Sequence, residues 1–203
     1  MTARVALIAV LVAACGGGKD AAPPPAPPPP MAKPQPVTIK LRNHRVAPIW
    51  VALPAPCASL PARLETKAGV QVPVDEVTVS CADSAAGRCG PPTECPGPRA
   101  IRIEGDGEVV VRWDGQVVTP RKLAKATGGC PTACVDRAGP PPATDYWLRA
   151  AAWSTCLGDD CGCAAAKPAD GCPQPAGLTG PPDLKAATPI DIPSALAVTI
   201  MFE

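Results

Sequence analysis

The cysteines are the residues that first suggest chemistry, because 11 of them occur among 203 residues. Cysteine thiols attach lipids, ligate metals, carry redox reactions or form disulfides. Cys15 lies in an apolar N-terminal segment, apart from the rest. The other ten are Cys57, Cys81, Cys89, Cys95, Cys130, Cys134, Cys156, Cys161, Cys163 and Cys172. Ten is an even number, so in an oxidising compartment these residues are candidates for five disulfides.

Spacing does not fix which cysteines pair, and we expect neighbours along the chain to do so. The expected bridges are Cys57–Cys81, Cys89–Cys95 and Cys130–Cys134. The last four cysteines, from Cys156 to Cys172, would then form two more. Each bridge would contribute about 2–4 kcal/mol. The domain needs this contribution, because four Trp, one Tyr and one Phe are its only aromatic residues.

A metal site is the competing interpretation of the same residues. Segment 159–163 places two carboxylates and two thiols within five residues, and Cys130 and Cys134 could add two more thiols. Structural zinc sites usually contain Cys-x2-Cys pairs, whereas the spacings here are Cys-x-Cys and Cys-x3-Cys. The Cys-x-x-Cys redox motif does not occur either. We therefore expect disulfides, with no metal and no cofactor other than lipid.

A nucleophilic catalytic site would have to use His44, the one histidine in the chain. His44 follows an expected strand in a polar turn, and no Gly-x-Ser-x-Gly elbow or phosphate-binding loop occurs. Glu104, Asp106 and Glu108 are close enough in sequence for glycosidase chemistry or weak Ca²⁺ binding. They alternate with glycines, which favours a polar turn between two strands. These observations predict that the protein is not an enzyme.

Four tryptophans offer another kind of chemistry, because an exposed indole on a sheet face can stack on a sugar ring. They are Trp50, Trp113, Trp147 and Trp153. Trp147 and Trp153 are an even number of positions apart, so they face one side of their strand and Tyr146 faces the other. In a domain with so few aromatic residues, we expect most of the tryptophans to be buried.

The N-terminal segment has the pattern of an export signal. Arg4 precedes an uninterrupted apolar run, Val5–Ala14, which is too short to span a hydrocarbon core of ~30 Å. Residues 12–15, Val-Ala-Ala-Cys, resemble the lipobox of bacterial lipoproteins. The resemblance implies cleavage before Cys15 and a covalent diacylglycerol and acyl lipid on its thiol, which would anchor the mature protein to a membrane. Gly16 stands where aspartate marks inner-membrane retention, which implies the outer membrane of the cell envelope.

A Pro-rich tether is expected to follow the lipid. Residues 15–36 contain nine of the 30 prolines. The block at 23–30 favours polyproline II, because proline fixes φ and removes the amide donors that other structures need. At about 3.1 Å per residue, the tether would hold a domain up to about 60 Å from the membrane. A docking motif for a Pro-binding partner is the alternative.

Residues 37–203 are expected to form one domain of short strands. Alternating or continuous apolar residues predict strands at 37–42, 48–53, 70–74, 77–79, 101–103, 146–153 and 196–202. Asp114 and Gly115, between two β-branched runs, predict a type I′ hairpin over 108–119. Only 121–126 could be helical, and 154–189 is expected to be a long irregular loop. The fold class predicted is all-β, a disulfide-rich antiparallel β-sandwich with long irregular loops.

Two segments resemble a known family. The Trp-Asp-Gly turn within 112–116 and the strand that begins at Tyr146 resemble the BsuPI-type proteinase inhibitor domain, although Gly-Pro-Pro-Pro at 139–142 replaces its Pro-Gly. The chain as a whole resembles exported lipoproteins of myxobacterial type. The first resemblance implies an immunoglobulin-like sandwich. Together with the loop 89–95, it makes protease inhibition an alternative function.

The net charge of the chain restricts the kinds of partner that we expect. The formal net charge is +1, and phosphate binding needs a basic surface, so nucleic acid is not expected as a partner. We expect a membrane-anchored, non-catalytic binding or structural module of the envelope, with a protein or glycan as its ligand. An envelope hydrolase that uses His44 is a further alternative.

Overall fold

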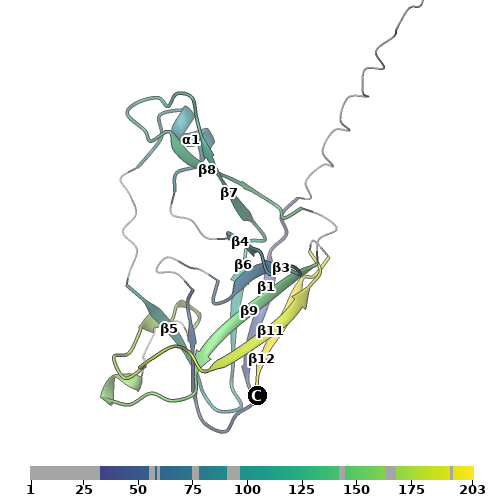
Figure 1. The fold of residues 1–203 in the computed structure, drawn as a ribbon, viewed down its shortest axis with the longest axis vertical. Helices are drawn as coiled ribbons and strands as arrows, with labels where there is room; N and C mark the ends of the chain where they lie inside the picture. The colour runs from purple at the N-terminus through teal and green to yellow at the C-terminus, as the bar shows by residue number, and fades with distance from the viewer. Residues whose placement is uncertain are drawn as a thin grey trace, which may run out of the picture. The chain divides into compact units, whose positions relative to one another are not determined.

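The computed structural model describes residues 33–54, 58, 60–74, 78–90, 97–141, 145–162, 168–192 and 194–203. Nearly all of the regular structure in them is β-strand, arranged in three sheets (Figure 1). The two larger sheets pack face to face, as the predicted β-sandwich requires.

The smaller layer of the sandwich has three strands in the order β12-β1-β6. Strand β1 (Val37–Asn43) lies in the centre, antiparallel to β6 (Glu108–Trp113) and parallel to β12 (Ala197–Phe202). The alternation expected for β1 is observed, because Val37, Ile39 and Leu41 are all buried. Among the strands that the structure describes, β1 and β12 are the one parallel pair, and a single isolated bridge, between Ser80 and Val135, is also parallel.

The larger layer has seven strands. They are β2 (Ile49–Ala52), β3 (Arg63–Thr66), β4 (Gln71–Val72), β5 (Arg99–Ile103), β9 (Tyr146–Trp153), β10 (Cys172–Pro173) and β11 (Leu184–Ile190). Strand β9, the longest, is central. One of its edges pairs with β2 and β3, and the other pairs with β11, which runs beside it in yellow in Figure 1.

The core lies between these two layers. Its largest fully buried side chains include Phe202, Ile39, Leu148, Ile101 and Ile200, which come from both sheets. One polar residue, Asn43, is also completely buried. Its amide nitrogen donates to the carbonyls of Ala47 and Glu104 at 2.8 and 3.0 Å, so its burial is compensated by hydrogen bonds.

A second region, here called the stapled ribbon, consists of α1 (Cys81–Ala85), β7 (Val117–Lys122) and β8 (Ala133–Ala138). Strands β7 and β8 form a separate two-stranded sheet, and α1 packs beside β8 (Figure 1). Ser80 begins the helix, because its hydroxyl oxygen accepts from the Asp83 amide at 3.0 Å. Disulfides Cys81–Cys134 and Cys89–Cys130 join the helical segment to the ribbon.

The predicted hairpin over 108–119 is wrong. Strand β6 pairs with β1, whereas β7 leaves the sandwich to pair with β8. A type I′ turn needs a positive φ at both central residues, but only Gly115 has one, at 75°. A Cβ atom at Gly115 would collide with the Gln35 carbonyl oxygen, so this turn packs against the chain that enters β1.

Two other expectations of secondary structure are corrected. Residues 121–126 are not helical, because β7 continues through Lys122 and pairs with β8. Residues 154–189 are not one irregular loop, because β11 adds a full-length strand to β9. Strands β3 and β8 and helix α1 were not expected. In the segment expected at 77–79, the described residues Thr78 and Val79 are not in a strand.

The expected pairing of cysteines is also wrong where the structure describes it. Cys81 bonds Cys134 and Cys89 bonds Cys130, so the three local bridges proposed from spacing do not form. The packing of α1 on β8 brings these residues together across a large sequence separation. Cys156–Cys161 agrees with the expected final cluster. Cys172 is disulfide-bonded as well, and Cys15, Cys57, Cys95 and Cys163 lie outside the described residues.

Candidate functional site

The candidate site lies on the outer face of the seven-stranded sheet. Alternation along β9 turns Tyr146 and Leu148 into the core and turns Trp147, Arg149 and Trp153 outward. On β2, which pairs with the far end of β9, Trp50 also faces outward. The outer face therefore carries three of the four tryptophans, and the fourth, Trp113, is in the core.

One end of this face is covered by the segment that follows β9. Trp50 and Trp153 form a small cluster with Ala100 and Leu178, and both tryptophans are buried. Their indole N–H groups donate to the carbonyls of Cys161 at 3.2 Å and Gly180 at 3.1 Å. These bonds satisfy the polar atom of each indole. The tryptophans at the covered end are therefore buried and hydrogen-bonded, and this end does not offer a binding surface.

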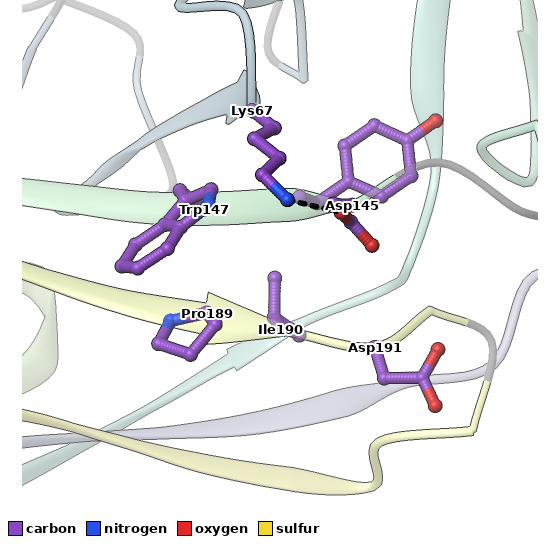
Figure 2. A pocket seen from close by; sticks show the side chains of 7 residues that line it. Lys67, Asp145, Trp147, Pro189, Ile190 and Asp191 are labelled. Atoms are coloured by element: carbon purple, nitrogen blue, oxygen red, sulfur yellow. Dashed lines mark hydrogen bonds and ion pairs between the residues drawn. The ribbon is translucent and has the colours of Figure 1, made fainter.

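The other end of the face is open and forms a shallow pocket of about 250 Å³ (Figure 2). Its lining residues are Lys67, Asp145, Tyr146, Trp147, Pro189, Ile190 and Asp191. Trp147 is only partly buried, and Pro189, its cross-strand partner on β11, is exposed. Figure 2 shows the indole and the proline ring on neighbouring strands, with Asp191 farther along the same edge. The floor of the pocket is therefore apolar, and its rim is charged.

Arg149 contacts Trp147 and holds its side chain in place. The guanidinium carbon lies 5.9 Å from the centroid of the indole ring, within the range of a cation–π interaction. The guanidinium Nε also donates to Glu65 on β3 at 2.7 Å, and the Glu65 side chain is only 17% exposed. Because Glu65 is the cross-strand partner of Trp147 on the other side, this arrangement limits the movement of the indole.

The side chains around the pocket have a small excess of acidic groups. Lys67 and Asp145 form an ion pair at 3.3 Å, with side chains 77% and 72% exposed. Asp191 has no ion-pair partner among the residues that the structure describes. With Arg149 and Glu65 included, the surroundings hold two cationic and three acidic side chains. Such a rim is a poor place for an anionic ligand and offers both hydrogen-bond donors and acceptors.

The residues considered for catalysis do not come together with this pocket. His44 is exposed at the end of β1, and its backbone amide donates to the Phe202 carbonyl. Glu104 pairs with Arg102 at 2.6 Å and Glu108 with Lys40 at 3.5 Å, so the acidic turn is divided between separate ion pairs. The polar turn expected between two strands is confirmed.

The thiol and carboxylate cluster near residue 160 is held by a disulfide. Cys156, Asp160 and Cys161 place potential ligand atoms within 4.8 Å of one another. However, the two sulfurs are bonded to each other, and the Asp160 carboxylate accepts from the Ala176 amide at 2.5 Å. In the disulfide form these atoms are therefore engaged in structure.

Two carboxylates outside the pocket have perturbed acidity. Hydrogen bonds from the Ser80 hydroxyl and from Arg88 hold the pKa of Asp83 below its usual value. Hydrogen bonds from the side chain and backbone amide of Ser154 lower the pKa of Asp183. Asp83 lies in the first turn of α1 and binds the hydroxyl of its N-cap, Ser80, and Asp183 ties the end of β9 to the segment before β11. Both serve local structure, and neither lines the pocket.

The sequence identified part of this site. The opposite orientations of Tyr146 and Trp147 and the burial of most tryptophans are confirmed. The charged rim was missed, because Lys67, Asp145 and Asp191 come from three distant segments that only the pairing of β3, β9 and β11 brings together. The outward position of Trp147 was the one signal available.

Comparison with protein-family models, with curated proteins and with solved structures finds no match to this chain. Within the described ranges, no helix is long and apolar enough to cross a membrane. The architecture and the pocket therefore carry the functional argument: a disulfide-rich all-β sandwich with one open aromatic site.

Proposed function

We propose that the protein is a lipid-anchored module of the cell envelope that binds a ligand, without catalysis, in the pocket at Trp147. The observation that supports binding is the contrast among the four tryptophans, all of which the structure describes. Trp50, Trp113 and Trp153 are at most 7% exposed and donate hydrogen bonds from their indoles, whereas Trp147 stays partly open beside a charged rim. Surface aromatic residues of this kind are enriched in binding sites.

The anchor rests on the resemblance of residues 12–15 to the lipobox, with Cys15 as the residue that carries the lipid. Gly16 favours the outer membrane over the inner membrane. The Pro-rich tether that follows would hold the sandwich away from the lipid surface. Replacing Cys15 with serine should abolish labelling by a fatty acid analogue, and labelling that persists would refute the anchor.

One of the observations that favoured protease inhibition, the alternative function, does not hold. The loop 89–95 was expected to be closed by a Cys89–Cys95 disulfide, but Cys89 is bonded to Cys130. The pocket at Trp147 is therefore the feature on which the functional proposal depends.

Retention in the envelope tests the binding function separately from the anchor. Cells that produce the full chain are extracted with a detergent that dissolves both membranes, and the protein remaining in the insoluble envelope material is measured. We expect Trp147→Ala to be retained several-fold less than the parent protein. The matched control is Val110→Ala, which shortens an exposed side chain on the outer face of the other sheet. Equal retention of Trp147→Ala and the parent would refute binding through this pocket.

A further inference from the structure

The class of ligand can be narrowed from the floor of the pocket. Trp147 and Pro189 are directly opposed on β9 and β11, so their rings lie next to each other on one face of the sheet (Figure 2). The negative face of an indole attracts weakly positive C–H groups. A flat, partly exposed platform of this kind suits a ligand with an apolar, C–H-rich face. An extended hydrocarbon chain would need a deeper cavity to be removed from water.

The charged rim of the pocket restricts the class of ligand further. The cationic groups of Lys67 and Arg149 are already paired with Asp145 and Glu65, and the net balance is acidic because of Asp191. A phosphate or carboxylate ligand would meet this excess of acid. A ligand rich in hydroxyl groups would instead find carboxylate acceptors and an ammonium donor at the edge of the platform.

The size of the pocket fits one ring. Pockets for drug-sized ligands have volumes of about 300–1,000 Å³, whereas this one has about 250 Å³ and is open to solvent. A single sugar ring could occupy it while the neighbouring rings of a chain continue along the exposed face.

We propose that the pocket at Trp147 binds one pyranose ring of an uncharged saccharide. The C–H face of the ring stacks on Trp147 and Pro189, and its hydroxyls donate to Asp145 and Asp191 and accept from Lys67. Arg149 is a positioning residue, because it holds the indole through its contact with the ring and its ion pair with Glu65. This inference rests on the proposed function, since it identifies the ligand of the same site.

Calorimetric titration tests the inference. The lipidated full chain is kept in a detergent without a sugar headgroup, because an alkyl glycoside would compete for the site. It is titrated to millimolar concentrations with trimers of β-1,4-linked glucose and of β-1,4-linked N-acetylglucosamine, and with inorganic phosphate. We expect at least one trimer to bind and phosphate not to bind. Trp147→Ala should weaken the binding of that trimer by at least about tenfold, and Trp147→Tyr should restore part of it.

Control variants distinguish the loss of a contact with the saccharide from the loss of the folded structure. Asp191→Asn should weaken binding by a smaller factor, and Asp159→Asn, an exposed acid outside the pocket, should leave binding unchanged. A thermal unfolding curve for each variant verifies folding. Binding of a trimer that is the same in Trp147→Ala and the parent would overturn the inference, as would heat from phosphate but from neither trimer. Failure of both trimers, while Trp147→Ala still loses retention in the envelope, would overturn the saccharide ligand and leave the binding function in place.

Discussion

The sandwich and the stapled ribbon keep their shape by different means. The sandwich buries a large set of aliphatic and aromatic side chains between two sheets. The described part of the stapled ribbon buries few residues: Cys81, Ser84, Val117, Val118, Cys130, Cys134 and Val135. Three of these seven are cysteines, in two disulfides, and Val117 belongs to the core of the sandwich. An apolar core therefore stabilises one region, and covalent links stabilise the other.

Because of this difference, we expect substitutions in the two regions to affect stability differently. In a packed core, the loss of one large side chain is felt by the whole domain, because the surroundings relax only in part. In a ribbon with little core, disulfides act mainly by restricting the unfolded chain. We expect the ribbon to unfold locally without taking the sandwich with it.

The largest effect should come from the core of the sandwich. Leu148 on β9 is fully buried, so Leu148→Ala should lower the free energy of unfolding by about 3–5 kcal/mol. Denaturant unfolding followed by tryptophan fluorescence measures it, since three of the four indoles are buried in or on the sandwich. Val110→Ala, at a 45% exposed position, should change stability little. Similar losses for the two variants would contradict the importance of this core.

The second-largest loss of stability should come from removing a disulfide of the stapled ribbon, and it should be confined to that region. Replacing both Cys81 and Cys134 with serine removes one disulfide, which typically contributes about 2–4 kcal/mol. Hydrogen exchange should accelerate in α1, β7 and β8, while the amides of β1 and β9 keep their protection. If exchange accelerates equally in the sandwich, the two regions unfold together and the comparison fails.

A smaller effect is expected at the start of α1. The Ser80 hydroxyl accepts from the Asp83 amide at 3.0 Å and donates to its carboxylate at 2.6 Å. Ser80→Ala removes this cap and should destabilise the ribbon by about 1 kcal/mol. Local hydrogen exchange in α1 measures it. Ser80→Thr should recover most of the loss, because threonine is also an N-cap residue and its hydroxyl can both accept from the Asp83 amide and donate to the Asp83 carboxylate.

Acid should produce the smallest effect. The pKa of Asp83 is lowered in the folded protein, so its ionised form favours folding. This contribution is present above about pH 5 and is lost as the pH falls below about 4. The protection factors of the α1 amides, which correct for the intrinsic pH dependence of exchange, should therefore fall with acid, and Asp83→Asn should remove that dependence. Asp183→Asn is the matched variant on the sandwich, where Ser154 lowers the pKa, and it should leave the ribbon unchanged.

The sequence predicted the sandwich where alternation was strong. Strands β1, β9 and β12 have clear apolar faces, and each was expected within one or two residues. Strand β11 was missed because Leu184–Ile190 has small or polar residues at most positions and gains its burial from β9. The ribbon was missed because its short strands carry too little apolar pattern. The disulfides follow from how α1 packs on β8, which spacing along the chain does not reveal.

The parallel pairing of β1 with β12 has a consequence for the order of events when the protein is made. Strand β1 is the first strand of the sandwich along the chain, and one of its two neighbours, β12, is the last that the structure describes. The smaller sheet can be completed only after all of the strands between them have been synthesised, and contacts so distant in sequence form slowly. Under the export that we propose, this delay would help to keep the chain unfolded until translocation is finished.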